Sequence, residues 1–147
     1  MAATVREATG DDADDIERLL DAAMLDFSRE RLRQRIERGS ALVAVVGDGA
    51  DDERVVGGCV FDDPARAPAS VGDADAPVTE IEHVAVHRSR RGRGIGRALV
   101  AAVDERATGP LIARFRESVR PFYESLGFEI REDGADMSEK RLLGVRV

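Results

Sequence analysis

The chain has a single cysteine and no long apolar run among its 147 residues. Cys59 has no second cysteine to pair with, so an internal disulfide is excluded. Its neighbours Val55, Val56 and Val60 predict a strand, in which a packed and inert thiol is typical. No segment reaches the roughly 18 apolar residues of a membrane span, and no apolar signal segment opens the chain. We therefore expect one cytoplasmic domain over residues 1–147, with no membrane contact.

Lysine is also nearly missing, since Lys140 is the only one, and 29 acidic residues outnumber 22 basic ones. The formal net charge of −7 argues against a general nucleic-acid binder. It mildly favours cationic substrates such as amines. This composition fits either a high-salt cytoplasm, which screens self-repulsion, or a GC-rich genome, and it does not separate the two.

An arginine- and glycine-rich segment stands between an apolar strand and an apolar helix. Residues 84–97 read Val-Ala-Val-His-Arg-Ser-Arg-Arg-Gly-Arg-Gly-Ile-Gly-Arg. Glycines let the backbone bring its N–H groups close to an anion, and the start of a helix adds unpaired donors. Arg91 and Arg93 can donate charge-assisted hydrogen bonds to phosphate oxygens. The segment therefore predicts a pyrophosphate-binding turn.

Two familiar phosphate loops do not fit this turn. A P-loop needs Gly-Lys-Ser/Thr, and Lys140 is the only lysine. A dinucleotide fingerprint needs a third glycine where Arg97 stands, and an acidic residue about 20 positions later that has no convincing candidate. A basic surface loop, of the kind that sometimes contacts RNA, remains as the plain alternative.

The remaining pattern is Arg91-x-x-Gly94-x-Gly96 directly after a Val-Ala-Val strand. It resembles the pyrophosphate-binding motif of the GCN5-related N-acetyltransferases (GNAT), which bind acetyl-coenzyme A. Residues 120–128, Arg-Pro-Phe-Tyr-Glu-Ser-Leu-Gly-Phe, resemble the C-terminal motif of the same family. The two motifs occur in the family's order, and the resemblance is specific over residues 78–130 and only architectural elsewhere.

The resemblance implies acetyl-coenzyme A as cosubstrate and a set of residues that hold it. These residues are Val84, Ala85, Val86, Arg91, Gly92, Arg93, Gly94, Ile95, Gly96, Arg97 and Phe122. It also implies that Tyr123 protonates the coenzyme A sulfur, which suits a phenol with a pKa near 10. Core packing is the alternative for this side chain. A backbone N–H within residues 84–86 is implied as the donor to the oxyanion.

Two glutamates are candidates for the base. Glu80 and Glu82 alternate with Ile81 and His83, so a period of two places both carboxylates on one face of a strand. The resemblance matches both positions to functional residues in branches of the family. A salt bridge to one of the many arginines, or a solvated edge, is the alternative.

One departure from the family concerns the segment before Tyr123. Arg116 stands where many members have Asn, which leaves the usual contacts of that segment open. Arg114, Arg116 and Arg120 are left to meet coenzyme A phosphates, an anionic substrate or the acidic surface.

Apolar periodicity and turn residues predict the elements. Strands are expected at 4–8, 41–46, 54–61, 78–87, 111–115, 128–131 and 141–147, and helices at 11–24, 28–39, 94–107 and 118–126. Residues 62–77, with three prolines and no apolar period, predict a loop. A strand–helix–strand unit at 78–115 predicts a parallel pair. The fold class is α/β (α+β mixed), with a mixed, mostly antiparallel central sheet and helices on both faces. The resemblance implies that the parallel pair splays.

The predicted function is N-acetyl transfer from acetyl-coenzyme A to a primary amine of a small molecule or protein. The amine attacks directly in a ternary complex. Two alternatives stay open: a non-catalytic acyl-coenzyme A-binding regulatory module of the same fold, and an RNA-contacting protein that uses the arginine turn. We expect no metal, because no His, Cys and Asp set has ligand spacing. We expect no nucleic-acid partner, and a homodimer is possible.

Overall fold

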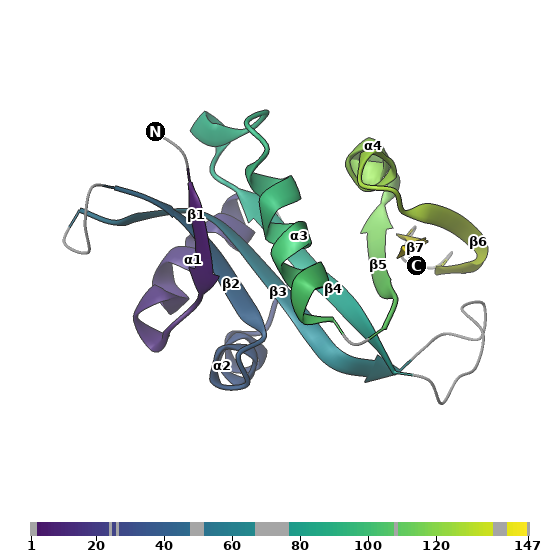
Figure 1. Ribbon diagram of the computed structural model, residues 1–147, viewed down its shortest axis with the longest axis horizontal. Coiled ribbons are helices and arrows are strands. Elements are labelled where there is room, and N and C mark those ends of the chain that lie inside the picture. The colour runs from purple at the N-terminus through teal and green to yellow at the C-terminus, as the bar shows by residue number, and fades with distance from the viewer. Residues whose placement is uncertain are drawn as a thin grey trace. The chain divides into compact units, whose positions relative to one another are not determined.

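The computed structural model describes residues 3–23, 25, 27–47, 52–66, 77–107, 109–136 and 141–146. Its helices are α1 (Ala13–Ala22), α2 (Arg29–Glu37), α3 (Ile95–Arg106) and α4 (Arg120–Ser125). Its strands are β1 (Thr4–Glu7), β2 (Ala41–Val46), β3 (Arg54–Arg66), β4 (Pro77–Val86), β5 (Leu111–Arg116), β6 (Glu129–Asp136) and β7 (Arg141–Arg146). Short 3₁₀ turns are η1 (Gly10–Asp12), η3 (Arg88–Arg90) and η4 (Glu117–Val119). Figure 1 labels the helices and strands.

The strands form one mixed sheet in the order β1-β2-β3-β4-β5-β7-β6. Strands β4 and β5 pair in parallel, with Thr79 opposite Leu111 and Ile81 opposite Ala113. The pairs β1–β2, β2–β3, β5–β7 and β6–β7 are antiparallel. In the described ranges, no helix combines the length and the apolar character that crossing a bilayer requires.

The chain divides into two compact units. The first unit comprises residues 1–61 and 83–105, and the second comprises residues 62–82 and 106–147. Strands β3 and β4 therefore contribute one end to each unit.

The first unit packs helices on opposite faces of β3. A Cβ added at Gly57 would lie 3.0 Å from Cγ2 of Ile95 in α3, whereas one added at Gly58 would meet Ile16 of α1 at 3.7 Å. Successive strand residues point to opposite faces, so α1 and α3 cover different faces of the strand. Because Gly57 has no side chain, the first turn of α3 approaches the sheet closely.

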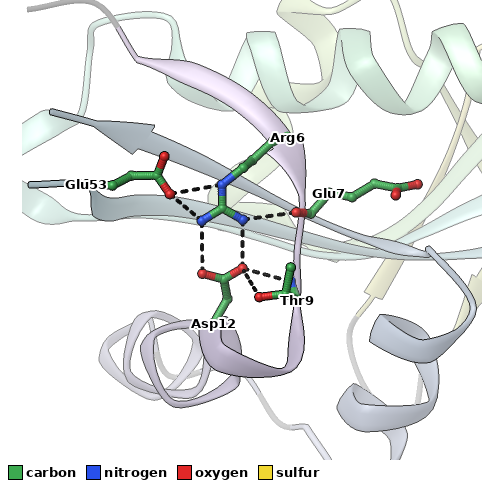
Figure 2. Close-up of polar contacts among 5 residues, drawn as sticks. All are labelled: Arg6, Glu7, Thr9, Asp12 and Glu53. Carbon is green, nitrogen blue, oxygen red and sulfur yellow. Dashed lines mark hydrogen bonds and ion pairs between the residues drawn. The ribbon is translucent and has the colours of Figure 1, made fainter. Parts of the chain in front are cut away.

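A charged network ties the start of the first unit together (Figure 2). The Arg6 guanidinium on β1 donates to both carboxylate oxygens of Asp12 in η1, at 2.8 and 3.1 Å, and its Nε donates to Glu53 at 3.0 Å. Asp12 also accepts from the backbone N–H of Thr9 at 2.8 Å. Burial alone would raise the pKa of Asp12, but the hydrogen bonds from Arg6 and Thr9 hold it below its ordinary value.

The second unit is built on β4, β5, β6 and β7. Its core contains the buried side chains of Val78, Ile112, Leu143 and Val145. The adjoining strand β5 continues into η4 and α4, which carry the aromatic residues discussed below.

Most predicted elements are confirmed, including the strand at 41–46 and a helix that starts after Ser28. The Ser28 hydroxyl caps α2 by accepting from Arg31 N at 3.3 Å, and Gly39, with a φ of 73°, follows the helix end. Two predicted helices begin as 3₁₀ turns, because η1 precedes α1 and η4 precedes α4. The prediction for Met24 lies outside the described residues.

The loop predicted at 62–77 is wrong at both ends. Strand β3 continues through Arg66 and β4 begins at Pro77, while residues 67–76 lie outside the described part. The strand ends carry polar contacts that apolar periodicity does not register: the Thr79 hydroxyl donates to Asp63 Oδ1 at 3.0 Å. The strand predicted at 128–131 is also longer, since β6 extends to Asp136.

Candidate functional site

The arginine- and glycine-rich turn connects β4 to α3 in the first unit. After β4 ends at Val86, η3 makes one short turn and the chain passes through residues 91–94 to α3. Gly92 and Gly94 have φ values of 78° and 81°. Other residues rarely adopt this left-handed conformation, so the backbone itself explains these two glycines.

The surface of this turn is open. Residues 91–94 are exposed, and a Cβ placed at Gly92 or Gly94 would meet no other atom within 4 Å. The positive φ therefore explains these glycines, and a tight contact does not, and the residues of the turn are exposed to solvent. Successive backbone N–H groups in a turn can form an anion-binding concavity.

The start of α3 is anchored under the turn. Ile95 is 7% exposed and packs against β3 at Gly57. The first hydrogen bond into the helix runs from Ala98 N to Gly94 O, at 3.0 Å. The N–H groups of the preceding residues have no partner in the helix's own ladder, and the positive end of the helix dipole lies beside them.

Arg91 is fixed at the edge of the turn. Its Nε donates to the carbonyl of Val86 at 3.3 Å, which ties the turn back to the end of β4. This contact uses one of the five N–H donors of a guanidinium. The other N–H donors of the planar guanidinium suit paired hydrogen bonds to two oxygens of a phosphate.

Glu80, one of the two candidate bases, forms a salt bridge with an arginine. Its Oε1 accepts from Arg114 Nη1 at 2.8 Å, across the parallel pair of β4 and β5. Glu80 lies opposite Ile112, so Arg114, two residues further along β5, shares its face. Both Glu80 and Glu82 are half-buried. The salt bridge that the sequence left open is therefore present at Glu80.

Tyr123 lies in an aromatic cluster of the second unit and is 6% exposed. Its ring stacks on Phe115, with centroids 4.3 Å apart and planes at 12°. The rings of Phe122 and Phe128 meet it edge-on at 5.1 and 5.3 Å. Three aromatic rings thus hold the phenol in one orientation, which suits a packing role and a positioned proton donor equally well.

The predicted site residues fall into two sets. The first unit holds residues 84–86 and 91–97, and the second holds Glu80, Glu82, Phe122 and Tyr123. Arg120, which the sequence left open for a ligand, forms salt bridges with Glu117 at 3.4 Å and Glu124 at 3.3 Å. Arg116 is exposed at the end of β5.

Sequence reasoning missed two further arginines, Arg18 of α1 and Arg88 of η3. Both line a hollow that also contains Arg91. Arg18 is 70 positions away from Arg88 in the chain, and only the packing of α1 on the sheet brings the two together. In the described part of the chain, no group of three His, Cys, Asp or Glu side chains is arranged to hold a metal ion.

Solved structures share this fold over nearly the whole chain. An acetyltransferase of the GNAT family from Streptococcus agalactiae aligns with a TM-score of 0.75 and 16% identity, over 99% of this chain and 95% of that one. An Arabidopsis thaliana protein in complex with the bisubstrate analogue CoA-Ac-MVNAL aligns with a TM-score of 0.72 and 16% identity, over 99% and 97%. The Bacillus subtilis N-acetyltransferase YlbP, in complex with coenzyme A, aligns with a TM-score of 0.69 and 13% identity, over 97% and 95%.

A family model gives the same answer from the sequence. The model of the acetyltransferase (GNAT) domain matches residues 37–130, which is more than half of the chain. The matched range includes both the turn at 91–97 and the segment around Tyr123. The chain therefore belongs to the GNAT acetyltransferase family.

Proposed function

We propose that this protein transfers the acetyl group of acetyl-coenzyme A to a primary amine of a small molecule or protein. The observation that carries the proposal is the open turn at 91–94, where two positive-φ glycines lead from the end of β4 into α3. The complexes of related folds with coenzyme A and with a coenzyme A-peptide analogue support the same cosubstrate.

The residues of the turn fit the pyrophosphate of the coenzyme. The exposed backbone at Gly92 and Gly94 and the start of α3 are proposed to donate N–H groups to the anion. Arg91 and Arg93, both exposed, add charge-assisted hydrogen bonds. Residues 84–86 are proposed to bind the rest of the arm through their backbone, and Phe122 to contact it through its half-buried ring.

When bound, acetyl-coenzyme A supplies an acetyl group on a thioester whose sulfur can leave as a thiolate. In the proposed reaction the amine nitrogen bonds to the acetyl carbon as the bond from that carbon to sulfur breaks. Tyr123 holds a proton for the departing sulfur, because a phenol stays protonated at neutral pH. A backbone N–H within residues 84–86 stabilises the charge that develops on the carbonyl oxygen.

We propose that Glu80 or Glu82 takes the proton from the ammonium, directly or through water. Both carboxylates are half-buried on β4. Glu80 accepts a hydrogen bond from Arg114 Nη1 at 2.8 Å, which holds its carboxylate beside β5.

A non-catalytic acyl-coenzyme A-binding module is the second candidate. The salt bridge at Glu80 and the aromatic packing of Tyr123 favour it, since both side chains already have structural roles. Acetyl transfer is preferred because Tyr123 and the glutamate pair occur together with the turn. An RNA-contacting role for the turn predicts salt-sensitive RNA binding that coenzyme A does not compete away.

The deciding experiment is a thiol-release assay with acetyl-coenzyme A over a panel of amines, amino acids, peptides and aminoglycosides. We expect amine-dependent release of free thiol with at least one class of acceptor. Binding of acetyl-coenzyme A without turnover on any amine would favour the regulatory module. A cytoplasmic location and a homodimer are proposed with it, and sedimentation of the purified protein tests the dimer.

A further inference from the structure

A hollow of about 550 Å³ in the first unit lies beside the turn that follows β4. Its polar lining comes from two places: Asp15 and Arg18 on α1, and His87, Arg88 and Arg91 in the segment after β4. The other lining side chains are apolar. A volume of this size is typical of sites that hold small molecules.

The lining is positive in a protein whose formal charge is −7. Three guanidinium groups and one carboxylate line the hollow. The carboxylate is Asp15, which lies 3.3 Å from Arg18. This salt bridge is weak, because the Arg18 side chain is 79% exposed. Arg18 therefore retains donors that can turn toward a ligand.

The positive charge is local to this hollow. A neighbouring hollow of about 400 Å³, which shares Arg18, is lined by three carboxylates, Asp14, Glu17 and Asp21, and by one further arginine, Arg29. The difference in lining shows that a positive surface is not a general property of α1.

His87 adds a ring nitrogen to the polar lining. Its Nδ1 accepts from the backbone N–H of Ser89 at 3.2 Å and lies 2.8 Å from the Ser89 hydroxyl. With Nδ1 used as an acceptor, the N–H donor of the ring is Nε2. The ring then presents an N–H to its surroundings, and His87 lines the hollow.

We propose that this hollow binds an anionic group on the amine acceptor, so that the preferred substrate is a small amine that also carries a carboxylate or a phosphate. The inference rests on the proposed function and names the substrate class for it. Arginine matches both groups through paired N–H donors. Arg18 and Arg88 carry the selectivity, because Arg91 is assigned to the coenzyme.

The test compares acceptors that differ only in the anion. Amino acids are assayed against their carboxamides, and phosphoethanolamine against ethanolamine, in wild type, Arg18→Ala and Arg88→Ala. The wild-type to variant ratio for each acceptor cancels the intrinsic difference in amine basicity. Arg33→Ala, which removes an exposed arginine of α2 outside the hollow, is the control.

We expect each variant to raise KM for the charged acceptors by about tenfold, the size of one charged hydrogen bond, and to leave KM for the neutral acceptors and for acetyl-coenzyme A unchanged. A rise in KM for amino acids alone would identify a carboxylate as the anion that is bound, and a rise for phosphoethanolamine alone would identify a phosphate. Equal effects on charged and neutral acceptors would overturn the inference. A rise in KM for acetyl-coenzyme A instead would assign the hollow to coenzyme phosphates. Failure of every amine to release thiol would contradict the proposed function, and the inference with it.

Discussion

At the residue scale, a substitution at Tyr123 separates a catalytic role of this residue from a packing role. Tyr123→Phe removes only the hydroxyl and keeps the ring that stacks on Phe115. We expect kcat to fall by about 10²–10⁴-fold, the usual loss on removing a general acid, with a much smaller change in KM. Steady-state kinetics with a good acceptor measure both constants.

The thermal midpoint of Tyr123→Phe serves as its control, because the stacked and edge-on contacts of the ring remain. An unchanged kcat in a normally folded variant would mean that the sulfur leaves without help from Tyr123. The residue would then belong to the aromatic cluster alone.

Asp12 makes a prediction for stability and its dependence on pH. Arg6 and Thr9 hold the pKa of Asp12 below its ordinary value of about 4, against the effect of its burial. A carboxylate whose folded pKa is lowered stabilises the fold above its unfolded pKa and loses that contribution as pH falls through the folded pKa. Asp12→Asn should therefore lower the free energy of unfolding by about 1–3 kcal/mol at neutral pH.

Urea denaturation at neutral and acidic pH measures the free energy of unfolding of wild type and Asp12→Asn. The difference between the two proteins should become smaller below about pH 4. The control is Asp14→Asn, an exposed carboxylate on α1, which we expect to change stability by no more than about 0.5 kcal/mol. An equal loss of unfolding free energy in Asp12→Asn and Asp14→Asn would contradict the role of the Arg6 network. A difference between wild type and Asp12→Asn that does not depend on pH would also contradict it.

At the scale of elements, the packing of α3 on β3 depends on one glycine. In Gly57→Ala the new Cβ meets Ile95 Cγ2 at 3.0 Å and Leu99 Cδ1 at 3.3 Å. We expect a loss of about 1–3 kcal/mol from overpacking and weaker acetyl-coenzyme A binding, because Ile95 begins the helix that carries the turn. Chemical denaturation and calorimetric titration give the two numbers.

Gly58→Ala is the matched control on the opposite face of the same strand. Its Cβ meets Ile16 at 3.7 Å, an ordinary van der Waals contact, so stability and coenzyme affinity should stay close to wild type. If Gly58→Ala proves as harmful as Gly57→Ala, loss of glycine from β3 is the cause and close packing of α3 is not.

The parallel pair of β4 and β5 leads to a prediction for the base. Glu80→Gln and Glu82→Gln should each lower kcat/KM only slightly, and the double substitution should lower it much more, because two half-buried carboxylates on one strand can pass the proton to solvent through a shared water chain. The pH profile of kcat/KM for these variants reports the base. A double glutamate variant with the wild-type rate and profile would exclude both residues.

Some features of these elements could be predicted from the sequence alone, and others could not. The turn at 91–94 was predictable, because its glycines, its arginines and the flanking apolar segments are all local. The pair of Glu80 and Arg114 was not, since it depends on a parallel register between residues 34 positions apart. The Arg6–Glu53 contact spans 47 positions. Apolar periodicity also predicts an end for β3 that is too early, because the strand continues through residues with polar contacts such as Thr79–Asp63.

At the scale of the whole molecule, the excess of acidic residues predicts a response to salt. With a formal net charge of −7, repulsion between like charges opposes the folded state and is screened by salt. The thermal midpoint should therefore rise as KCl is added from low ionic strength. KCl is preferred to sulfate, which stabilises proteins by exclusion from their surface. A midpoint that falls with KCl would show that salt bridges outweigh the repulsion.

The proposed function depends on the coenzyme occupying the turn between β4 and α3. Three variants at one position separate the possible causes of a loss of coenzyme binding. Gly94→Ala introduces backbone strain, Gly94→Gln adds bulk, and Gly94→Glu adds a negative charge. Gly94 has a φ of 81°, so all three are strained, and only the last repels a phosphate. Gly10→Glu, at an open position without positive φ, is the control for added charge elsewhere.

Isothermal titration of acetyl-coenzyme A into these proteins is the most direct test. We predict binding to the wild type and to Gly10→Glu, weaker binding to Gly94→Ala and Gly94→Gln, and none to Gly94→Glu. Absence of binding to the wild type across low and high salt, or binding to Gly94→Glu as tight as to Gly94→Gln, would contradict the assignment of the turn to the coenzyme pyrophosphate.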